Sequence, residues 1–524
     1  MKKIILIILS LLIFLGIIVV MTIVFRYCPP EGPWPMPPWC ETEIKKGEDA
    51  QIFFTVSVPY NTDISKGIKL DISDGQVLDM IQISDLTYQA VIDVFGQEKI
   101  KYNYRSESGV SEDMNLIVNE KEKKVFDGVS SWSDQGFEPD LNMVLGADMA
   151  DTWGRNYNFE WFEDTRNNVE SSFGRLSELG VQETGARDFF WVKYDGEAKD
   201  RVDVKDSNFY IEEEIFWNDQ RDEAMTQEDM DKLVKQAHDR DMEIVWRSNL
   251  HFNNIGAYIT SGDIVGGVGS DFDRLAQDKS REWVEAFFAQ WARVLNHRAQ
   301  MLKKSGFDTM IITPGWHNPS FHPYEELANK RWKETINSLQ NYFEGNIGVI
   351  IDRYSIMGEQ SGPDDWNKYD YYRQADMVYM DIFYLPGAYQ VQPNPNIEEM
   401  KKAFDRYLDD IETRARELDI QLSLNLGFSS FKDSVNYEGF HEFYEFYKPE
   451  VTSVEADWQH QADIYEAFMR SLEGRDFIER ITILGYWWDD AMDPEVKPRI
   501  SINNSIRNKT AEAVIDKWFG AANN

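Results

Sequence analysis

The amino-acid sequence predicts an α/β fold, a (β/α)₈ barrel preceded by a transmembrane helix and a small antiparallel β-sandwich. Three patterns support this prediction. An uncharged apolar run opens the sequence, and strand-like stretches with a period of two residues follow it. Strand-like and helical stretches then alternate through residues 136–524. Strands that alternate with helices in this way are typical of a parallel sheet.

The chain begins with a run that is long enough to cross a bilayer. Residues 4–25 carry no charge and are almost wholly apolar, and as a helix they would measure about 33 Å. The run ends without the small residues that precede a cleavage site for signal peptidase. Lys2 and Lys3 favour the cytoplasmic side for the N-terminus. We therefore predict an uncleaved signal-anchor helix over residues 1–25, single-pass in the cell membrane, with the barrel facing the extracellular side.

Residues 26–45 are rich in proline, which predicts a stiff stalk between the membrane and the folded part. The two cysteines of the chain, Cys28 and Cys40, bracket six prolines and two tryptophans. In an extracellular setting this pair favours a disulfide between Cys28 and Cys40. Two cysteines are too few for the thiolate zinc sites found in many small domains, and the sequence predicts no metal site.

Residues 46–120 predict the β-sandwich. Apolar residues alternate with polar or smaller ones around residues 52–58, 88–94 and 100–104. A charged stretch at residues 120–124 predicts the connector to the barrel. The segment FFTVSVPYNT…TYQAVIDVFGQEKIKYNYR resembles starch-binding and related early-set sandwich modules that are attached to glycosidases. The resemblance implies a sugar-binding role, and a spacer role is the alternative.

The barrel region, residues 136–524, contains eight strand-like stretches. They lie near residues 142–148, 182–191, 242–250, 307–314, 347–353, 376–384, 420–427 and 481–488. Helical stretches lie between them at residues 164–179, 227–240, 280–304, 323–343, 397–418 and 457–473. Eight such units fit a closed barrel better than an open sheet. An open sheet for a dinucleotide would need a glycine-rich turn after its first strand, and LGADMADTWG lacks that turn.

The composition argues against some partners. The formal net charge is −37, from 91 acidic and 54 basic residues, and such a field repels phosphate backbones. Nucleic acid is therefore not an expected partner. The chain also has 17 tryptophans, most of which we expect in the core, although indoles exposed in a cleft stack well on sugar rings.

Several segments of the barrel region carry a family resemblance. They are MTQEDMDKLVKQAHDRDMEIVWRSNL, ADMVYMDIFYLPG, LSLNLGFSSF, ADWQHQADIYEAFMRSL…ITILGYWWDDAMDP and SIRNKTAEAVIDKWF. In this order they resemble the second helix with the third strand, the sixth strand, the seventh strand, the last helix with the eighth strand, and the C-terminal helix of TIM-barrel glycoside hydrolases. The resemblance is greatest to the β-mannanases of family 113 and extends to related retaining-clan barrels. It implies a carbohydrate substrate and no cofactor.

The same resemblance implies two catalytic glutamates that this sequence lacks at the matching positions. The general acid should end strand four, where the chain reads IITPGWHN, and no glutamate lies nearby. The nucleophile should end strand seven, where Asn425 stands instead. An amide cannot form a glycosyl ester, and retaining hydrolysis requires two carboxyl groups about 5 Å apart. The mechanism of the family therefore cannot be carried over to these residues.

Polar and aromatic residues at the carboxyl ends of the predicted strands are the candidate site, because barrels carry their functional side chains there. The candidate catalytic carboxylates are Asp148, Asp352, Asp381 and Asp489. The candidate substrate-binding residues are Arg247, Asn249, His251, Trp316, His317, Tyr384, Asn425, Trp487 and Trp488. Indoles would cover the apolar faces of sugar rings, while the polar side chains would bind hydroxyl groups.

Each carboxylate also has a structural interpretation. Asp352 is followed by Arg353, which suits an ion pair. Asp381 stands where the resembling families use an aspartate for structure or substrate contact, and Asp489 could cap a loop. Three functions therefore remain open. The protein is a hydrolase with relocated carboxylates, a non-catalytic pseudoenzyme that binds glycan at the cell surface, or a structural surface protein that uses the barrel as a scaffold.

Overall fold

The structure is a computed structural model of the chain. It describes residues 44–150, 163–194, 208–212, 214–217, 220–223, 225–251, 278–314, 319–351, 369–436, 455–487 and 502–522. Within these ranges, no helix combines the length and the apolar character that crossing a membrane would require. The predicted transmembrane helix at residues 1–25 and the predicted disulfide between Cys28 and Cys40 lie outside the described residues.

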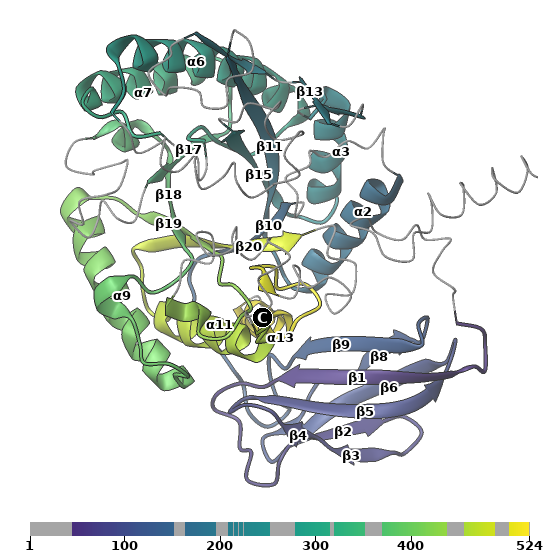
Figure 1. Cartoon of the computed structure of the whole chain (residues 1–524). Coiled ribbons are helices and arrows are strands. Elements are labelled where there is room, and N and C mark those ends of the chain that lie inside the picture. Colours follow the sequence, from purple (N-terminus) through teal and green to yellow (C-terminus); the bar gives the residue numbers. More distant parts are fainter. Residues whose placement is uncertain are drawn as a thin grey trace, which may run out of the picture.

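The N-terminal part of the described chain is a sandwich of two β-sheets (Figure 1). One sheet has the order β4 (Ile81–Gln82), β5 (Thr87–Phe95), β1 (Asp49–Ser57) and β9 (Glu122–Gly128). The other has the order β3 (Val77–Asp79), β2 (Lys69–Ile72), β6 (Lys99–Ser106) and β7 (Gly109–Val110), with β8 (Met114–Ile117) paired to β6. Alternate apolar residues of β1 are fully buried between the sheets, as the period of two predicts.

Strand β9 corrects the sequence-based prediction in two respects. It pairs parallel to β1, so the sandwich is not purely antiparallel. It also begins at Glu122, inside the stretch predicted to be a connector. The sequence did not predict this strand because four of its seven residues are charged and they do not alternate with apolar residues. Gly128 shows how closely β9 approaches the C-terminal helix, since a Cβ atom there would lie 2.0 Å from the backbone nitrogen of Lys517.

The second part is a closed barrel of eight parallel strands, which confirms the predicted (β/α)₈ fold. The strands are β10 (Val144–Ala150), β11 (Glu183–Tyr194), β15 (Glu243–His251), β16 (Thr309–Ile311), β17 (Asn346–Ile351), β18 (Met377–Ile382), β19 (Leu422–Leu426) and β20 (Ile478–Trp487). Closure is made by β10, which pairs parallel with both β11 and β20. Beside the barrel, β12 (Phe209–Glu212) pairs with β11, and β13 (Glu214–Trp217) pairs with β14 (Gln220–Glu223).

Helices surround the barrel strands (Figure 1). They are α2 (Glu163–Glu178), α3 (Gln227–His238), α6 (Arg281–Ser305), α7 (Glu325–Leu339), α9 (Ile397–Leu418), α11 (Trp458–Leu472) and α13 (Thr510–Ala522). Short 3₁₀ helices are η3 (Tyr371–Gln374), η4 (Gly387–Tyr389) and η5 (Ser434–Asn436). Capping residues in the sequence mark the ends of several helices. For example, Thr226 and Asp229 form a capping box at the start of α3, and Gly306 ends α6 in the left-handed conformation.

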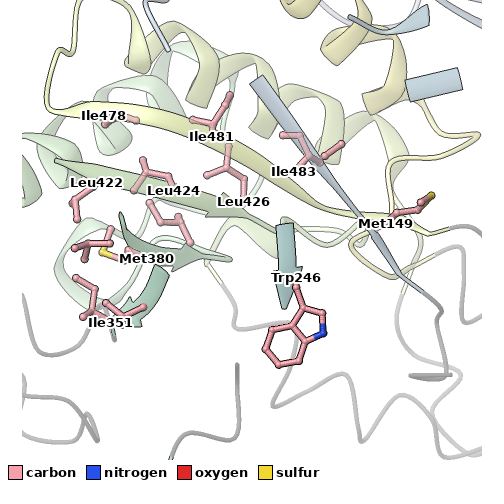
Figure 2. Close-up of a cluster of buried hydrophobic side chains, with 14 of the residues drawn as sticks. Met149, Trp246, Ile351, Met380, Leu422, Leu424, Leu426, Ile478, Ile481 and Ile483 are labelled. Atoms are coloured by element: carbon pink, nitrogen blue, oxygen red, sulfur yellow. The ribbon is translucent and has the colours of Figure 1, made fainter. Parts of the chain in front are cut away.

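The main hydrophobic core lies between the strands and the surrounding helices. Figure 2 shows part of it, including Met149, Trp246, Met380 and Leu424, each from a different strand. In each strand, core residues such as these occupy every second position, and the residues between them face the inside of the barrel. Five tryptophans are among the largest fully buried side chains: Trp246, Trp283, Trp291, Trp332 and Trp518. These five of the 17 tryptophans therefore serve packing.

The sandwich is joined to the barrel through α11 and α13 (Figure 1). The buried ammonium group of Lys517 on α13 donates to the carbonyl oxygen of Val58 in the sandwich, at 3.1 Å. The backbone nitrogen of Gly128 donates to Asp516 at 2.7 Å, and Gln459 on α11 donates to Ser84 at 2.9 Å. These hydrogen bonds connect the sandwich to helices α11 and α13 of the barrel.

Candidate functional site

Charged and polar side chains occupy the inward-facing positions of several barrel strands. Asp148 on β10 lies between Ala147 and Met149, which both belong to the core beneath the helices. The carboxylate of Asp148 therefore points to the barrel interior. The same alternation turns Arg247 on β15 and Asn425 on β19 inward, and both are almost completely buried.

Asp148 forms an ion pair inside the barrel. Its Oδ2 atom accepts from Nε of Arg187 at 2.7 Å and lies 2.6 Å from Nη2 of the same guanidinium. Both side chains are buried, so little solvent weakens this attraction. Its other oxygen, Oδ1, lies 3.9 Å from Nε of Arg247. This arrangement favours a structural role for Asp148 over the catalytic role predicted from the sequence.

Arg247 packs on an aromatic ring from across the barrel. Its guanidinium lies 5.1 Å from the ring centroid of Tyr379 on β18, within the range of a cation–π interaction. Burial raises the pKa of Tyr379, so its phenol stays neutral at ordinary pH. Gly185 provides the space for this arrangement, since a Cβ atom there would lie 2.3 Å from Oδ1 of Asp148 and 3.0 Å from Nε of Arg247.

Asn425 and Asp381 form a second polar pair on neighbouring strands. They are register partners on β19 and β18, and Nδ2 of Asn425 donates to Oδ1 of Asp381 at 2.7 Å. Asn425 is fully buried, whereas Asp381 is partly exposed. The residue at the position of the expected nucleophile therefore holds a carboxylate through its amide.

Several polar atoms of this interior have no hydrogen-bond partner. Among the described residues, they include Nε and Nη2 of Arg247, Nδ2 of Asn249, Oδ1 of Asn425 and Oδ1 of Asp148. More than nine in ten buried polar groups in folded proteins are paired, because an unpaired one costs about 1–3 kcal/mol. Such atoms therefore lie on the inward faces of three strands, β10, β15 and β19.

The other predicted site residues fall into three groups. Tyr384 follows β18 and is buried with Phe383 and Leu484, so its ring contributes to packing. His251 and Trp487 end strands β15 and β20, and their side chains lie outside the described part. The remaining candidates also lie outside the described residues: Asp352, Asp489, Trp316, His317 and Trp488.

Two further residues organise the site: Arg187, which the sequence placed at the end of a predicted strand without an assigned role, and Tyr379, which it did not single out. An arginine at an inward position of a strand is a usable signal, because a buried guanidinium requires a carboxylate nearby. Tyr379 gave no such signal, since an aromatic residue in an apolar strand is usually core. Within the described ranges, His, Cys, Asp and Glu side chains do not gather in groups of three or more that could hold a metal ion.

No family model matches the chain, and no curated protein matches it. In structure it is similar to a GH113 β-1,4-mannanase with 12% sequence identity and a TM-score of 0.48, which covers 73% of this chain and 99% of that one.

Two further solved structures illustrate the range of the similarity. The GH113 β-mannanase AaManA from Alicyclobacillus acidocaldarius has 12% identity and a TM-score of 0.46, and the match covers 74% of this chain and 98% of that one. A GH10 endoxylanase retrieved from a sugarcane soil metagenome has 11% identity and a TM-score of 0.36, with coverage of 72% and 96%. The barrel fold follows from the strand register described above.

Proposed function

We propose that this chain is a membrane-anchored extracellular carbohydrate-active protein whose barrel binds a poly- or oligosaccharide. The observation that carries the proposal is the set of buried, unpaired polar atoms on Arg247, Asn249 and Asn425. Sugar hydroxyl groups both donate and accept hydrogen bonds. One ligand can therefore satisfy the donors on Arg247 and Asn249 and the acceptor on Asn425.

Binding without cleavage is the form of this function that the described residues favour. Asn425 has no carboxylate with which to attack a sugar carbon, and its amide is bonded to Asp381. Asp148 is engaged by Arg187 and is fully buried, which suits neither a general acid nor a nucleophile. We therefore propose a pseudoenzyme that holds a glycan at the cell surface.

A second candidate function is hydrolysis with relocated carboxylates. Asp381 supports it, because this carboxylate is partly exposed at the carboxyl end of its strand. Glycosidic cleavage requires a second carboxyl group, for which Asp352 and Asp489 remain the sequence-based candidates.

A screen of mannans, glucans, galactans and the surface polysaccharide of the source organism separates these functions. We expect binding without release of reducing ends, and we expect Asn425→Ala to weaken binding about five-fold through the loss of one hydrogen bond. Binding and reducing ends would be measured in parallel on the same samples. Reducing ends that disappear with Asp381→Asn would establish the second candidate. Cleavage that Asn425→Ala alone abolishes would contradict both candidates, and neither binding nor cleavage would leave the scaffold role.

The proposed anchor is tested by topology. Because the apolar run at residues 4–25 has lysines only on its N-terminal flank, we expect protease added to intact cells to remove the barrel and leave a short membrane-embedded fragment. Protease added after the membrane is opened serves as the control. A mature protein that is released in soluble form and begins near residue 26 would contradict the anchor.

A further inference from the structure

Among the described residues, the interior of the barrel contains a buried arginine, Arg247, with no carboxylate at hydrogen-bond distance. Arg247 is only 5% exposed, and its Nε and Nη2 atoms form no hydrogen bond among the described residues. Within the described residues, its one ion-pair contact is between Nε of Arg247 and Oδ1 of Asp148, at 3.9 Å. A buried guanidinium normally has an anionic partner at hydrogen-bond distance, because removing its charge from water is costly.

Asp148 neutralises Arg187 more directly than it does Arg247. The contacts between Asp148 and Arg187 measure 2.6 and 2.7 Å, more than 1 Å shorter than the contact with Arg247. Arg247 instead lies against the face of Tyr379, a neutral ring. A cation–π contact of this kind contributes less than a hydrogen-bonded carboxylate would.

Two neighbouring residues extend the same environment. Asn249 lies two residues beyond Arg247 on the same strand face, and its buried Nδ2 group is also an unpaired donor. Asn425, which stands where the family resemblance implies a glutamate, contributes an uncharged amide to the interior. The site therefore presents unpaired donors on β15 and an uncharged amide on β19, and this amide donates to the carboxylate of Asp381 on β18.

We propose that the glycan bound by this barrel is acidic, and that a uronic-acid carboxylate pairs with Arg247 while Asn249 donates a second hydrogen bond. This inference rests on the proposed function and names the substrate class of the same site. A planar carboxylate matches the fork of N–H groups on a guanidinium. The acidic surface of the chain repels anions at long range, so the short-range contacts inside the barrel must supply the preference.

The test compares matched ligands on the full-length chain in detergent at constant ionic strength. The probes are oligogalacturonate and oligomannuronate, their carboxyl-reduced forms, which carry a neutral hydroxymethyl group instead, and neutral mannan oligosaccharides. We expect at least one of the acidic oligosaccharides to bind about ten-fold or more tightly than its reduced form. Arg247→Gln should abolish this preference, whereas Arg247→Lys should retain part of it, because the charge remains.

The outcomes separate this inference from the proposed function. Equal binding of acidic and reduced ligands, or binding of neutral oligosaccharides alone, would overturn the acidic-glycan inference and leave the glycan-binding function intact. Binding of neither class would remove both. If Arg247→Gln does not fold, as judged by its thermal unfolding, Asn249→Ala provides the second variant. It should weaken binding of the acidic ligand more than binding of the reduced one, and an equal loss for both would overturn the inference.

Discussion

Replacing Asp148 with alanine should destabilise the barrel by about 3–5 kcal/mol. Asp148 is fully buried and binds Arg187 at 2.6–2.7 Å, and it is also the nearest described acid to Arg247. Its removal leaves two guanidinium groups inside the barrel without their shared counter-charge. The cost arises from these uncompensated charges, and it is larger than the packing loss from a short side chain.

Equilibrium unfolding in urea, followed by tryptophan fluorescence, measures this effect. The matched control is Asp476→Ala on the barrel surface, where the side chain is 80% exposed and pairs with Arg416. An exposed pair of this kind contributes at most about 1 kcal/mol. Similar unfolding midpoints for the two variants would show that Asp148 does not carry the charge balance of the interior.

Replacing Glu466 with alanine should destabilise the joint between barrel and sandwich by a similar amount, about 3–5 kcal/mol. Glu466 on α11 accepts from Lys517 at 2.6 Å, from Trp518 at 2.8 Å and from Arg470 at 2.8 Å. Lys517 is completely buried and also holds Val58 of the sandwich. Without Glu466, the ammonium group of Lys517 would remain in the interior with no carboxylate in this set of contacts.

The contribution of Glu466 to stability depends on pH. Burial alone would raise the pKa of Glu466, but the charges of Lys517 and Arg470 outweigh burial and lower it below its usual value. The unfolded chain has a glutamate pKa of about 4.3. The stability from Glu466 is therefore present above about pH 4.3 and is lost as the pH falls through the lower pKa of the folded state. We expect the cost of Glu466→Ala to be greatest at pH 7 and to decrease as the pH is lowered below about 4.3.

A double replacement provides the control for the joint. Glu466→Met combined with Lys517→Met removes both charges and fills the space with apolar atoms, so it should be less damaging than Glu466→Ala alone. The stability of both variants would be measured by thermal unfolding, and the stability of the joint by limited proteolysis between sandwich and barrel. A double variant that is as unstable as Glu466→Ala would place the cost in lost packing and not in the unpaired lysine.

The sequence by itself determined the architecture of the barrel. The hydrophobic periodicity of the sequence predicts eight strands that alternate with helices, because this periodicity depends only on near neighbours along the chain. The inward direction of Asn425 was also predictable, because Asn425 lies in a short strand between leucines whose alternation fixes the face of each side chain. Strand β9 was missed because its charged residues alternate poorly, and only its pairing with β1 makes it a strand.

Tertiary structure decided which of the inward-facing residues meet. Asp148, Arg187, Arg247 and Tyr379 come from four strands, and strand alternation gives the face of each side chain but not its partner across the barrel. Closure of the sheet brings Tyr379 against Arg247 and places Asp148 between two arginines. Asp148 was a candidate catalyst from its place at a strand end alone, and only the closed barrel shows that its neighbours are two arginines, because the three-dimensional neighbours set the charge balance of a buried group.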